Sequence, residues 1–450
     1  MPKTVDILNF AKYHFIGIGG VSMSALAKYL LFMGKTVTGS DISQTDETKK
    51  LTYLGAVVYY SHREENACDA QVVVYTSAIS ETNPELTYAK KHGIPLIKRS
   101  ELLRAISLTY KRTVGISGSH GKTTATAMLT HVLSDGGLDP TSFIGGYDLK
   151  YGNLKRGKGE VCVYEACEYK RNFLDLKPYV SVVLNIDKDH MESFGDEKTL
   201  INSFADFISG SISVINADDK NSRRIISHTS VTFGIENDAN YYATDIIRCG
   251  KGYSFTVNGA RKLGKIKLQV SGKHNIYNAL SVIAVAQILG VPFYKTQASL
   301  NGFKGVGRRM ENIGKVFGVD AICDYAHHPK EIDETFKSFD KNTTVVFQPH
   351  TYSRTELLMD DFVAVLKKIP NLIIYRTYPA REEYNERGSA KTLCDKLTVE
   401  HTGICTYAHT IEELKKQLKA RVKENGVVVF FGAGDIYGIA TSLVEKQADN

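Results

Sequence analysis

The chain has 450 residues, which is more than one hydrophobic core usually holds, so two or three domains are expected. Apolar residues make up 43% and charged residues 23%, which excludes a disordered or fibrous chain. The formal net charge is +7, but the basic residues form no tail. This charge suits anionic small molecules at least as well as nucleic acid, and we expect no nucleic-acid partner.

Cysteine usage and hydropathy indicate a compartment. The seven cysteines are scattered and contain no Cys-x-x-Cys pair, which is typical of reduced thiols in a cytosol. The first residues lack a basic-then-apolar signal, and no apolar run approaches the length of a membrane span. The sequence therefore predicts a cytoplasmic protein without membrane insertion.

Residues 12–110 alternate short apolar runs with helical patterns. Strands are expected at 14–18, 35–39 and 72–75, and a helix at 21–32. Strands that alternate with helices indicate an α/β unit with a parallel sheet.

A glycine cluster follows the first expected strand. Gly17, Gly19 and Gly20 precede the helix, and Asp41 closes the next strand, where such a fold places a ribose-binding acid. Ser22 replaces the third glycine of the dinucleotide fingerprint, so the signal is incomplete. A bound diphosphate, a tight turn without a ligand and a dehydrogenase site all remain open here.

The strongest motif is Gly118-Ser-His-Gly-Lys-Thr-Thr124, which lies between the β-prone run 113–117 and a helical pattern. This arrangement is typical of a phosphate-binding loop, in which a helix N-terminus favours an anion. Lys122 is expected to meet the outer phosphates of a nucleotide and Thr123 a Mg²⁺ ion. Ile116 stands where the full Walker pattern has its first glycine.

Acids and a histidine follow the next strands of this unit, which are expected at 161–164, 181–185 and 213–216. Glu165 follows the first of these strands, and its carboxylate suits a phosphate-bound Mg²⁺. Glu168 is interpreted as a surface acid. His190, in Asn185-Ile-Asp-Lys-Asp-His190, is expected to complete a metal or water site. For Asp189 the alternative is a helix N-cap.

The segment 231–270 is polar and alternating, which predicts antiparallel hairpins. A helix is expected at 276–289. Asn278 or Asn275 offers both a donor and an acceptor to the edge of a base, although helix capping by Asn275 is the simpler reading. The glycine-rich run 301–307 predicts a linker.

A third unit follows, with strands expected at 321–323, 344–347, 372–375 and 427–431. Arg309 and Arg354 suit phosphate or carboxylate groups. We expect His327 to bind substrate by hydrogen bonds and His328 to pack a helix. The turn at 432–435 has no assigned role.

Taken together, these motifs resemble the Mur ligase family of cell-wall synthesis over nearly the whole chain. The strings that carry the resemblance, in family order, are His14-Phe-Ile-Gly-Ile-Gly-Gly, Gly39-Ser-Asp, Gly118-Ser-His-Gly-Lys-Thr-Thr, Asn185-Ile-Asp-Lys-Asp-His, His274-Asn-Ile-Tyr-Asn, Asp324-Tyr-Ala-His-His-Pro and Gln348-Pro-His-Thr-Tyr-Ser-Arg. His120 and the Tyr-Ala-His-His-Pro string are similar to the alanine-adding branch, and the absence of lysine from 199 to 219 fits that branch.

The resemblance implies a Rossmann-like UDP-sugar-binding domain at 1–110, a P-loop-type ATP-binding domain at 111–306 and a Rossmann-like amino-acid-binding domain at 307–450. It implies catalytic roles for Lys122, Glu165, His190 and Arg309, and Mg²⁺ ligands in Thr123, Glu165 and His190. The implied ATP-binding residues are Gly118, Ser119, His120, Gly121, Lys122, Thr123, Thr124, Asn278, Arg309 and Asp324. The implied substrate-binding residues are Gly17, Gly19, Gly20, Asp41, Ser77, His327, His350 and Arg354.

The implied reaction is ATP-driven ligation of L-alanine to the lactyl carboxylate of UDP-N-acetylmuramate through an acyl phosphate, by a monomer or weak homodimer. The general base is left open among His190, His327 and Glu165. The alternatives are a ligase that recycles a preformed peptide, a folylpolyglutamate-synthase-like ligase, and a non-catalytic nucleotide-binding protein. Departures from the family are Cys167 to Lys170 after Glu165, Cys323 before Asp324, and Thr351 in place of arginine.

Overall fold

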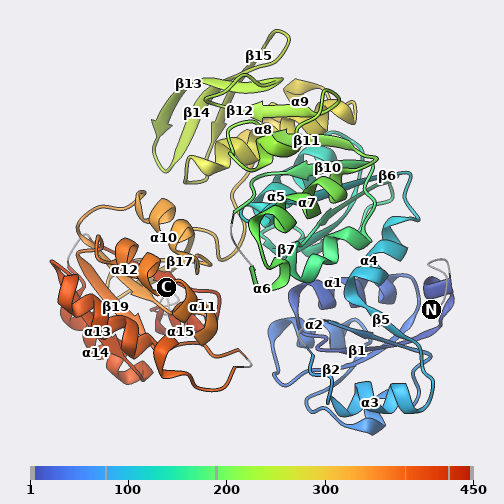
Figure 1. Cartoon of the computed structure of the whole chain (residues 1–450), viewed down its shortest axis with the longest axis horizontal. Helices are drawn as coiled ribbons and strands as arrows, with labels where there is room; N and C mark the ends of the chain where they lie inside the picture. Colours follow the sequence, from blue (N-terminus) through green and yellow to red (C-terminus); the bar gives the residue numbers. More distant parts are fainter. Residues whose placement is uncertain (1–5, 77–78, 188–190, 381, 424–425, 446–450) are drawn as a thin grey trace, which may run out of the picture. The chain divides into compact units, whose positions relative to one another are not determined.

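The computed structural model contains three β-sheets with helices packed around them, which confirms the predicted α/β fold class (Figure 1). It describes residues 6–76, 79–187, 191–380, 382–423 and 426–445. The chain divides into two compact units, one formed by 1–269 with 273–304 and the other by 270–272 with 305–450. No helix among the described residues has both the length and the apolar character needed to cross a membrane.

The first sheet has five parallel strands in the order β3-β2-β1-β4-β5. Apolar runs such as that of β4 are buried because helices cover a parallel sheet. Its elements are η1 (Asp6–Asn9), β1 (Lys12–Ile16), α1 (Val21–Phe32), β2 (Thr36–Ser40), α2 (Asp46–Tyr53), β3 (Val57–Tyr59), η2 (Glu64–Ala67), β4 (Val72–Tyr75), α3 (Pro84–Lys91), β5 (Leu96–Lys98) and α4 (Arg99–Ser107).

The second sheet has ten strands in the order β15-β14-β13-β12-β11-β10-β6-β9-β7-β8. Its elements are β6 (Arg112–Ser117), α5 (Lys122–Asp135), β7 (Thr141–Asp148), β8 (Gly152–Lys155), β9 (Val161–Glu165), η3 (Tyr169–Asp175), β10 (Val180–Val183), α6 (Met191–Phe194), α7 (Glu197–Ile208), β11 (Ile212–Asn216), η4 (Ser222–Ile225), β12 (Val231–Gly234), β13 (Tyr241–Cys249), β14 (Gly252–Asn258), β15 (Lys262–Leu268), α8 (His274–Ile288) and α9 (Phe293–Gly302). The predicted hairpins are confirmed for β13 to β15, but the prediction is wrong for β12, which pairs in parallel with both of its neighbours.

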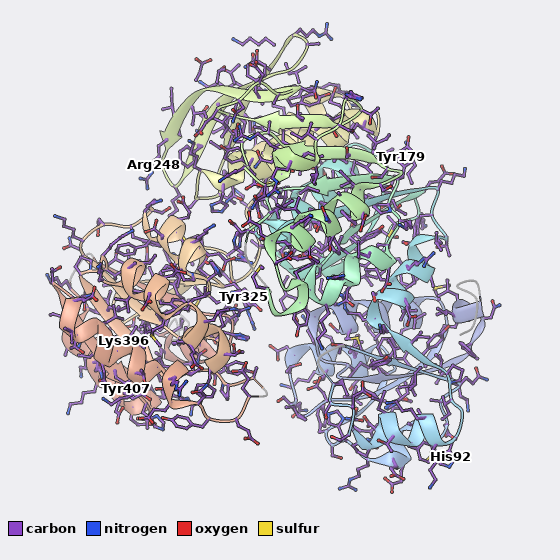
Figure 2. All side chains as sticks on the ribbon, in the orientation of Figure 1. His92, Tyr179, Arg248, Tyr325, Lys396 and Tyr407 are labelled. Carbon is purple, nitrogen blue, oxygen red and sulfur yellow. The ribbon has the colours of Figure 1, made fainter. Side chains whose placement is uncertain are left out.

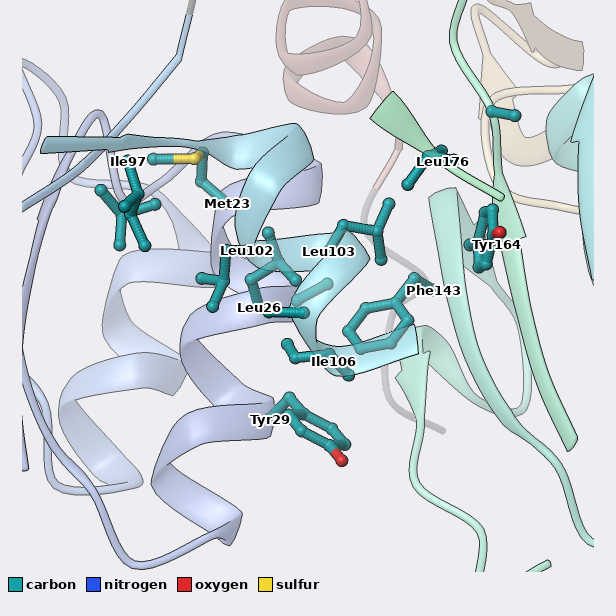
Figure 3. Close-up of a cluster of buried hydrophobic side chains, with 14 of the residues drawn as sticks. Met23, Leu26, Tyr29, Ile97, Leu102, Leu103, Ile106, Phe143, Tyr164 and Leu176 are labelled. Atoms are coloured by element: carbon teal, nitrogen blue, oxygen red, sulfur yellow. The ribbon is translucent and has the colours of Figure 1, made fainter. Parts of the chain in front are cut away.

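The first two sheets share one compact unit because a helix joins them. Figure 3 shows Leu103 and Ile106 of α4 between Leu26 of α1 and Phe143 of β7, and all of these side chains belong to one buried cluster. Burying a leucine or phenylalanine side chain contributes about 1.5–3 kcal/mol. Because the buried cluster spans both sheets, the contacts do not separate a domain at residue 110. The predicted domain limits at 110 and 306 stay predictions.

The third sheet has the order β16-β17-β21-β18-β19-β20, in which only β16 is antiparallel. Its elements are β16 (Glu311–Val316), β17 (Val319–Asp324), α10 (Pro329–Phe336), β18 (Thr343–Phe347), α11 (Tyr352–Leu357), α12 (Met359–Leu366), β19 (Asn371–Tyr375), η5 (Glu386–Gly388), α13 (Ala390–Glu400), β20 (Ile404–Ala408), α14 (Ile411–Arg421), β21 (Val427–Phe431) and α15 (Ile436–Leu443). Two buried clusters, one on each side of this sheet, form its core.

Candidate active site

The loop between β6 and α5 has the geometry that its glycines require. Gly118 has φ +138° and Gly121 has φ +88°, both in the region that favours glycine. A Cβ on Gly121 would lie 2.6 Å from Oδ1 of Asn278, so the loop also needs glycine for close packing. Helix α5 begins directly after Gly121, which places a helix N-terminus at the loop.

Asn185 holds this loop by hydrogen bonds to Ser119 and His120, a role that the sequence did not reveal. The backbone N–H of Ser119 donates to the carbonyl oxygen of Asn185 at 3.1 Å. The N–H of His120 donates to Oδ1 of Asn185 at 2.8 Å, and Nδ2 of Asn185 donates to the His120 carbonyl at 3.0 Å. Strand β10, which leads to Asn185, pairs in parallel with β6, and this register brings the two loops together.

Lys122 is held by four acceptor atoms. Its Nζ donates to the carbonyl oxygens of Gly118 and Ser119, and it lies 3.0 Å from both carboxylate oxygens of Glu168. Glu168 is 1% exposed, so its interpretation as a surface acid is wrong. Burial acts to lower the pKa of Lys122, but the charges of Glu168 and neighbouring groups outweigh burial and raise this pKa above its ordinary value.

Glu165 ends β9 beside the loop because β9 pairs with β6, with Ile116 opposite Glu165. The backbone N–H of Gly145 donates to Oε1 of Glu165 at 2.6 Å. A Cβ on Gly145 would overlap this carboxylate, so Gly145 is a further site residue that the sequence did not indicate. Thr123 and Thr124 lie in the first turn of α5, close to the same edge of the sheet.

The donor set fits a Mg²⁺ ion. Magnesium takes oxygen ligands and is usually bound by one or two carboxylates together with substrate phosphates. Glu165 and the Thr123 hydroxyl supply such oxygens beside the phosphate loop. The described residues contain no cluster of three or more His, Cys, Asp or Glu side chains arranged for a metal. His190 lies outside the described residues.

Asn278 lies on α8 and is 3% exposed. Its Nδ2 donates to Oδ1 of Asn275 at 2.9 Å, and its own Oδ1 faces Gly121. The proposed cap by Asn275 is wrong, because α8 begins before it, after Lys273, with no side-chain cap. The structure thus brings Asn278 to the phosphate loop.

The first glycine cluster forms the turn between β1 and α1. The N–H of Gly19 donates to Oδ2 of Asp41 at 2.9 Å, and Gly17 has φ +80°. The N–H of Gly17 donates to the carbonyl oxygen of Ser40 at 2.8 Å, and Gly20 is the N-terminal cap residue of α1. Gly17, Gly19, Gly20 and Asp41 therefore lie together, and Ser77 lies outside the described residues.

The C-terminal unit gathers a second cluster from the loops after β17 and β18 and before β16. The rings of His327 and His350 are 5.8 Å apart between centroids, and Nη1 of Arg354 lies 3.4 Å from Nδ1 of His350. The guanidinium carbon of Arg309 lies 5.2 Å from the centroid of the Tyr325 ring. Tyr325 is labelled in Figure 2. His328 accepts a hydrogen bond from the N–H of Lys330 at the start of α10, in agreement with a structural role.

Asp324 ties two of these loops together. Its carboxylate accepts hydrogen bonds from the N–H groups of Met310 and Ala326, each at 2.8 Å. Burial raises the pKa of Asp324 above its ordinary value, although Arg309 and the two N–H groups favour the ionised form. Its carboxylate therefore supports the loop of Arg309 through the N–H of Met310.

Part of the backbone strain among the described residues lies at this second cluster. Three residues other than glycine have left-handed φ values there: Arg308 at +60°, Met310 at +51° and Thr351 at +67°. Thr351 is β-branched, which makes this conformation costly, by about 1–3 kcal/mol. Hydrogen bonds hold it, including the one from the Thr351 N–H to the Tyr378 carbonyl at 2.9 Å. Such strain is typical of functional sites.

Burial, together with His327 and Arg354, lowers the pKa of His350 to about 3. His350 is therefore neutral at neutral pH, and the positive charge of the cluster comes from Arg309 and Arg354. A cluster with two guanidinium groups and a neutral imidazole suits an anionic group such as a carboxylate.

Three family models match the chain in sequence. They are the Mur ligase family catalytic domain at 12–111, the Mur ligase middle domain at 116–286, and the Mur ligase glutamate ligase domain at 308–434.

Individual proteins match over nearly the whole length. A UDP-N-acetylmuramate–L-alanine ligase of Caldanaerobacter subterraneus is 40% identical, over 98% of this chain and 99% of the relative. One of Aquifex aeolicus is 41% identical, over 94% and 95%. The crystal structure of UDP-N-acetylmuramate-alanine ligase from Thermotoga maritima has a TM-score of 0.84 at 30% identity, over 96% of this chain and 98% of that one. The chain therefore belongs to the Mur ligase family and is an ATP-dependent, amide-forming ligase.

Proposed function

We propose that this ligase joins L-alanine to the lactyl carboxylate of UDP-N-acetylmuramate, with release of ADP and phosphate, in peptidoglycan precursor synthesis. The observation that carries the proposal is the match, at 40–41% identity over 94–98% of the chain, to relatives named for that reaction. We also propose a cytoplasmic enzyme that acts as a monomer or weak homodimer.

The chemistry needs activation of the carboxylate. A carboxylate oxygen attacks the γ-phosphorus of ATP, the bond to ADP breaks, and an acyl phosphate forms. The nitrogen of alanine then attacks the carbonyl carbon, and phosphate leaves. Bringing two anions together requires positive charge at the transferred phosphoryl group.

The residues of the phosphate loop are proposed to supply that charge. Lys122 is fully charged because Glu168 and two carbonyl oxygens bind its ammonium group, and helix α5 begins beside it. Glu165, oriented by the N–H of Gly145, and Thr123 are the proposed ligands of Mg²⁺, with His190 as a third. A bound Mg²⁺ would neutralise phosphate charge. Asn278, beside Gly121, is proposed to bind adenine, and Asp324 a ribose hydroxyl.

The remaining residues are proposed to bind the two other substrates. Gly17, Gly19 and Gly20, with Asp41, form the turn proposed for the diphosphate of the UDP-sugar, and Ser77 is proposed to join them. Arg309 is instead proposed to contact a phosphate group of ATP. His327, His350 and Arg354 are proposed to bind the amino acid, which fits an anionic group at this cluster.

The test is an assay of phosphate release with one substrate omitted at a time. We expect release only when ATP, UDP-N-acetylmuramate and L-alanine are all present. Release with a preformed L-Ala–D-Glu–diaminopimelate peptide in place of alanine would instead identify a recycling ligase.

A further inference from the structure

Glu331 contacts two proposed site residues, although nothing in the sequence singled it out. It lies in the first turn of α10, and its side chain is 13% exposed. Its Oε2 accepts a hydrogen bond from the backbone N–H of His327 at 3.1 Å and lies 3.5 Å from Nδ1 of the same ring. Its Oε1 lies 3.9 Å from Nη1 of Arg309. One carboxylate therefore spans the loop of His327 and the loop of Arg309.

The surroundings of His327 determine which ring nitrogen carries the proton. Nδ1 lies 3.0 Å from the carbonyl oxygen of Tyr325, which only accepts hydrogen bonds, and the Glu331 carboxylate approaches the same nitrogen. Both neighbours are acceptors, so Nδ1 must be the donor. In the neutral ring, Nε2 then holds the lone pair.

His350 has the opposite arrangement. Its Nδ1 faces Nη1 of Arg354 at 3.4 Å, and a guanidinium only donates. Nδ1 of His350 therefore accepts, and its Nε2 carries the proton. Because the pKa of His350 is lowered to about 3, this ring cannot take a proton at neutral pH. Of the two adjacent histidines, only His327 is arranged as a base.

We propose that Glu331 is a positioning residue that holds His327 as the Nδ1–H tautomer, so that Nε2 of His327 takes the first proton from the amino group of alanine. This inference rests on the proposed function. The alanine ammonium gives one proton to Nε2, and the neutral nitrogen bonds to the carbonyl carbon. The carbon–oxygen bond to phosphate breaks, and the second nitrogen proton leaves with phosphate. The imidazolium then releases its proton to water.

Glu331 stabilises the imidazolium because its negative charge lies beside Nδ1. Among the described residues, the rings of His350 and Tyr325 also face His327, at 5.8 and 5.4 Å between centroids. The guanidinium of Arg309 lies beside Glu331, and that of Arg354 lies beside His350. The positive charge of each arginine opposes protonation of His327. The negative charge of Glu331 therefore acts against the positive charges of the two arginines.

The test compares Glu331→Gln with Glu334→Gln in the full-length protein. Glu334 lies on the same helix, is 53% exposed and pairs with Lys337, so it controls for the loss of one charge from α10. Nitrogen-15 NMR of histidine side chains reports the tautomer and titration of each ring, and His327→Gln assigns the signal. We expect wild-type His327 to carry its proton on Nδ1. Glu331→Gln should lower the pKa of His327 by about one unit, because an opposite charge has been removed.

In kinetics, Glu331→Gln should lower kcat/KM for alanine about tenfold, with KM for ATP within about twofold, and Glu334→Gln should change neither. A proton on Nε2 in the wild type, or an unchanged His327 titration in Glu331→Gln, would overturn the proposal. If Glu331→Gln does not fold, Glu331→Asp keeps the charge and must retain the Nδ1–H tautomer. The NMR result needs no substrate, so it stands apart from the omission assay that judges the proposed function.

Discussion

The phosphate loop and the C-terminal histidine–arginine cluster are built in different ways. The loop comes from one contiguous segment, and its shape depends mainly on glycine backbone and the start of α5, with Asn185 as an added support. The C-terminal cluster joins loops that are far apart in sequence, and side chains such as Asp324 and Glu331 hold these loops together. A backbone-built site tolerates few changes within a short segment, whereas a side-chain-built site depends on its supporting residues.

The largest expected effect lies in the loop. Lys122→Ala removes the ammonium group proposed to stabilise the transferred phosphoryl group, and we expect kcat/KM to fall about 10³-fold or more. Phosphate release measures this loss, and circular dichroism should show an intact fold. Turnover close to that of the wild type would refute the role given to the loop.

Gly145→Ala tests whether the backbone also orients the metal ligand. The added methyl group would overlap the Glu165 carboxylate and displace it from the N–H of Gly145. Loss of a supporting hydrogen bond to a metal ligand typically costs tenfold or more in metal affinity, so we expect the Mg²⁺ concentration for half-maximal activity to rise about tenfold. Gly302→Ala, at the end of α9 with nothing within 4 Å of an added Cβ, should leave the Mg²⁺ dependence unchanged.

Glu168→Ala tests the ion pair between Lys122 of the loop and the buried Glu168. It leaves the partly buried ammonium group of Lys122 without its carboxylate partner, which should lower the free energy of unfolding by about 3–5 kcal/mol. The matched change Glu160→Ala breaks an exposed pair with Lys111 and should cost less than about 1 kcal/mol. Thermal denaturation of both variants measures the difference, and equal losses would contradict the role of burial.

The last prediction concerns the C-terminal cluster, where the effect on stability is smallest near neutral pH and grows as the pH falls. The pKa of His350 is lowered to about 3 in the folded protein, so below its unfolded value of about 6.5 the unfolded state binds the proton more readily. Stability is lost as pH falls from about 6.5 towards 3, by up to about 1.4 kcal/mol per pH unit. His350→Gln should flatten this slope in denaturant titrations at several pH values, and an unchanged slope would show that His350 is not buried as described.

The sequence predicted the fold class and the loop because both depend on local patterns. The strands near Thr113 and Val161 have buried apolar runs, and the Gly-Lys-Thr string marks a strand–helix turn. The roles of Asn185, Gly145 and Glu168 could not be predicted in this way. They depend on which strands become neighbours in the sheet, and that register is not encoded near the residues themselves.

The cluster in the C-terminal unit shows the same limit. The histidines and arginines were recognised from residue type and from the resemblance to a family. Their tautomers, the low pKa of His350 and the part played by Glu331 follow from contacts between loops. The left-handed backbone of Thr351 could not be predicted either, because β-branched residues normally avoid it.

We propose that the loop and the cluster serve one reaction that proceeds through an acyl phosphate. The most direct measurement uses UDP-N-acetylmuramate labelled with oxygen-18 in the lactyl carboxylate, together with ATP and L-alanine. If the carboxylate oxygen attacks the γ-phosphorus, one labelled oxygen must appear in the released phosphate, and release must depend on alanine. Phosphate without the label, formed at the rate of amide synthesis, would contradict the account.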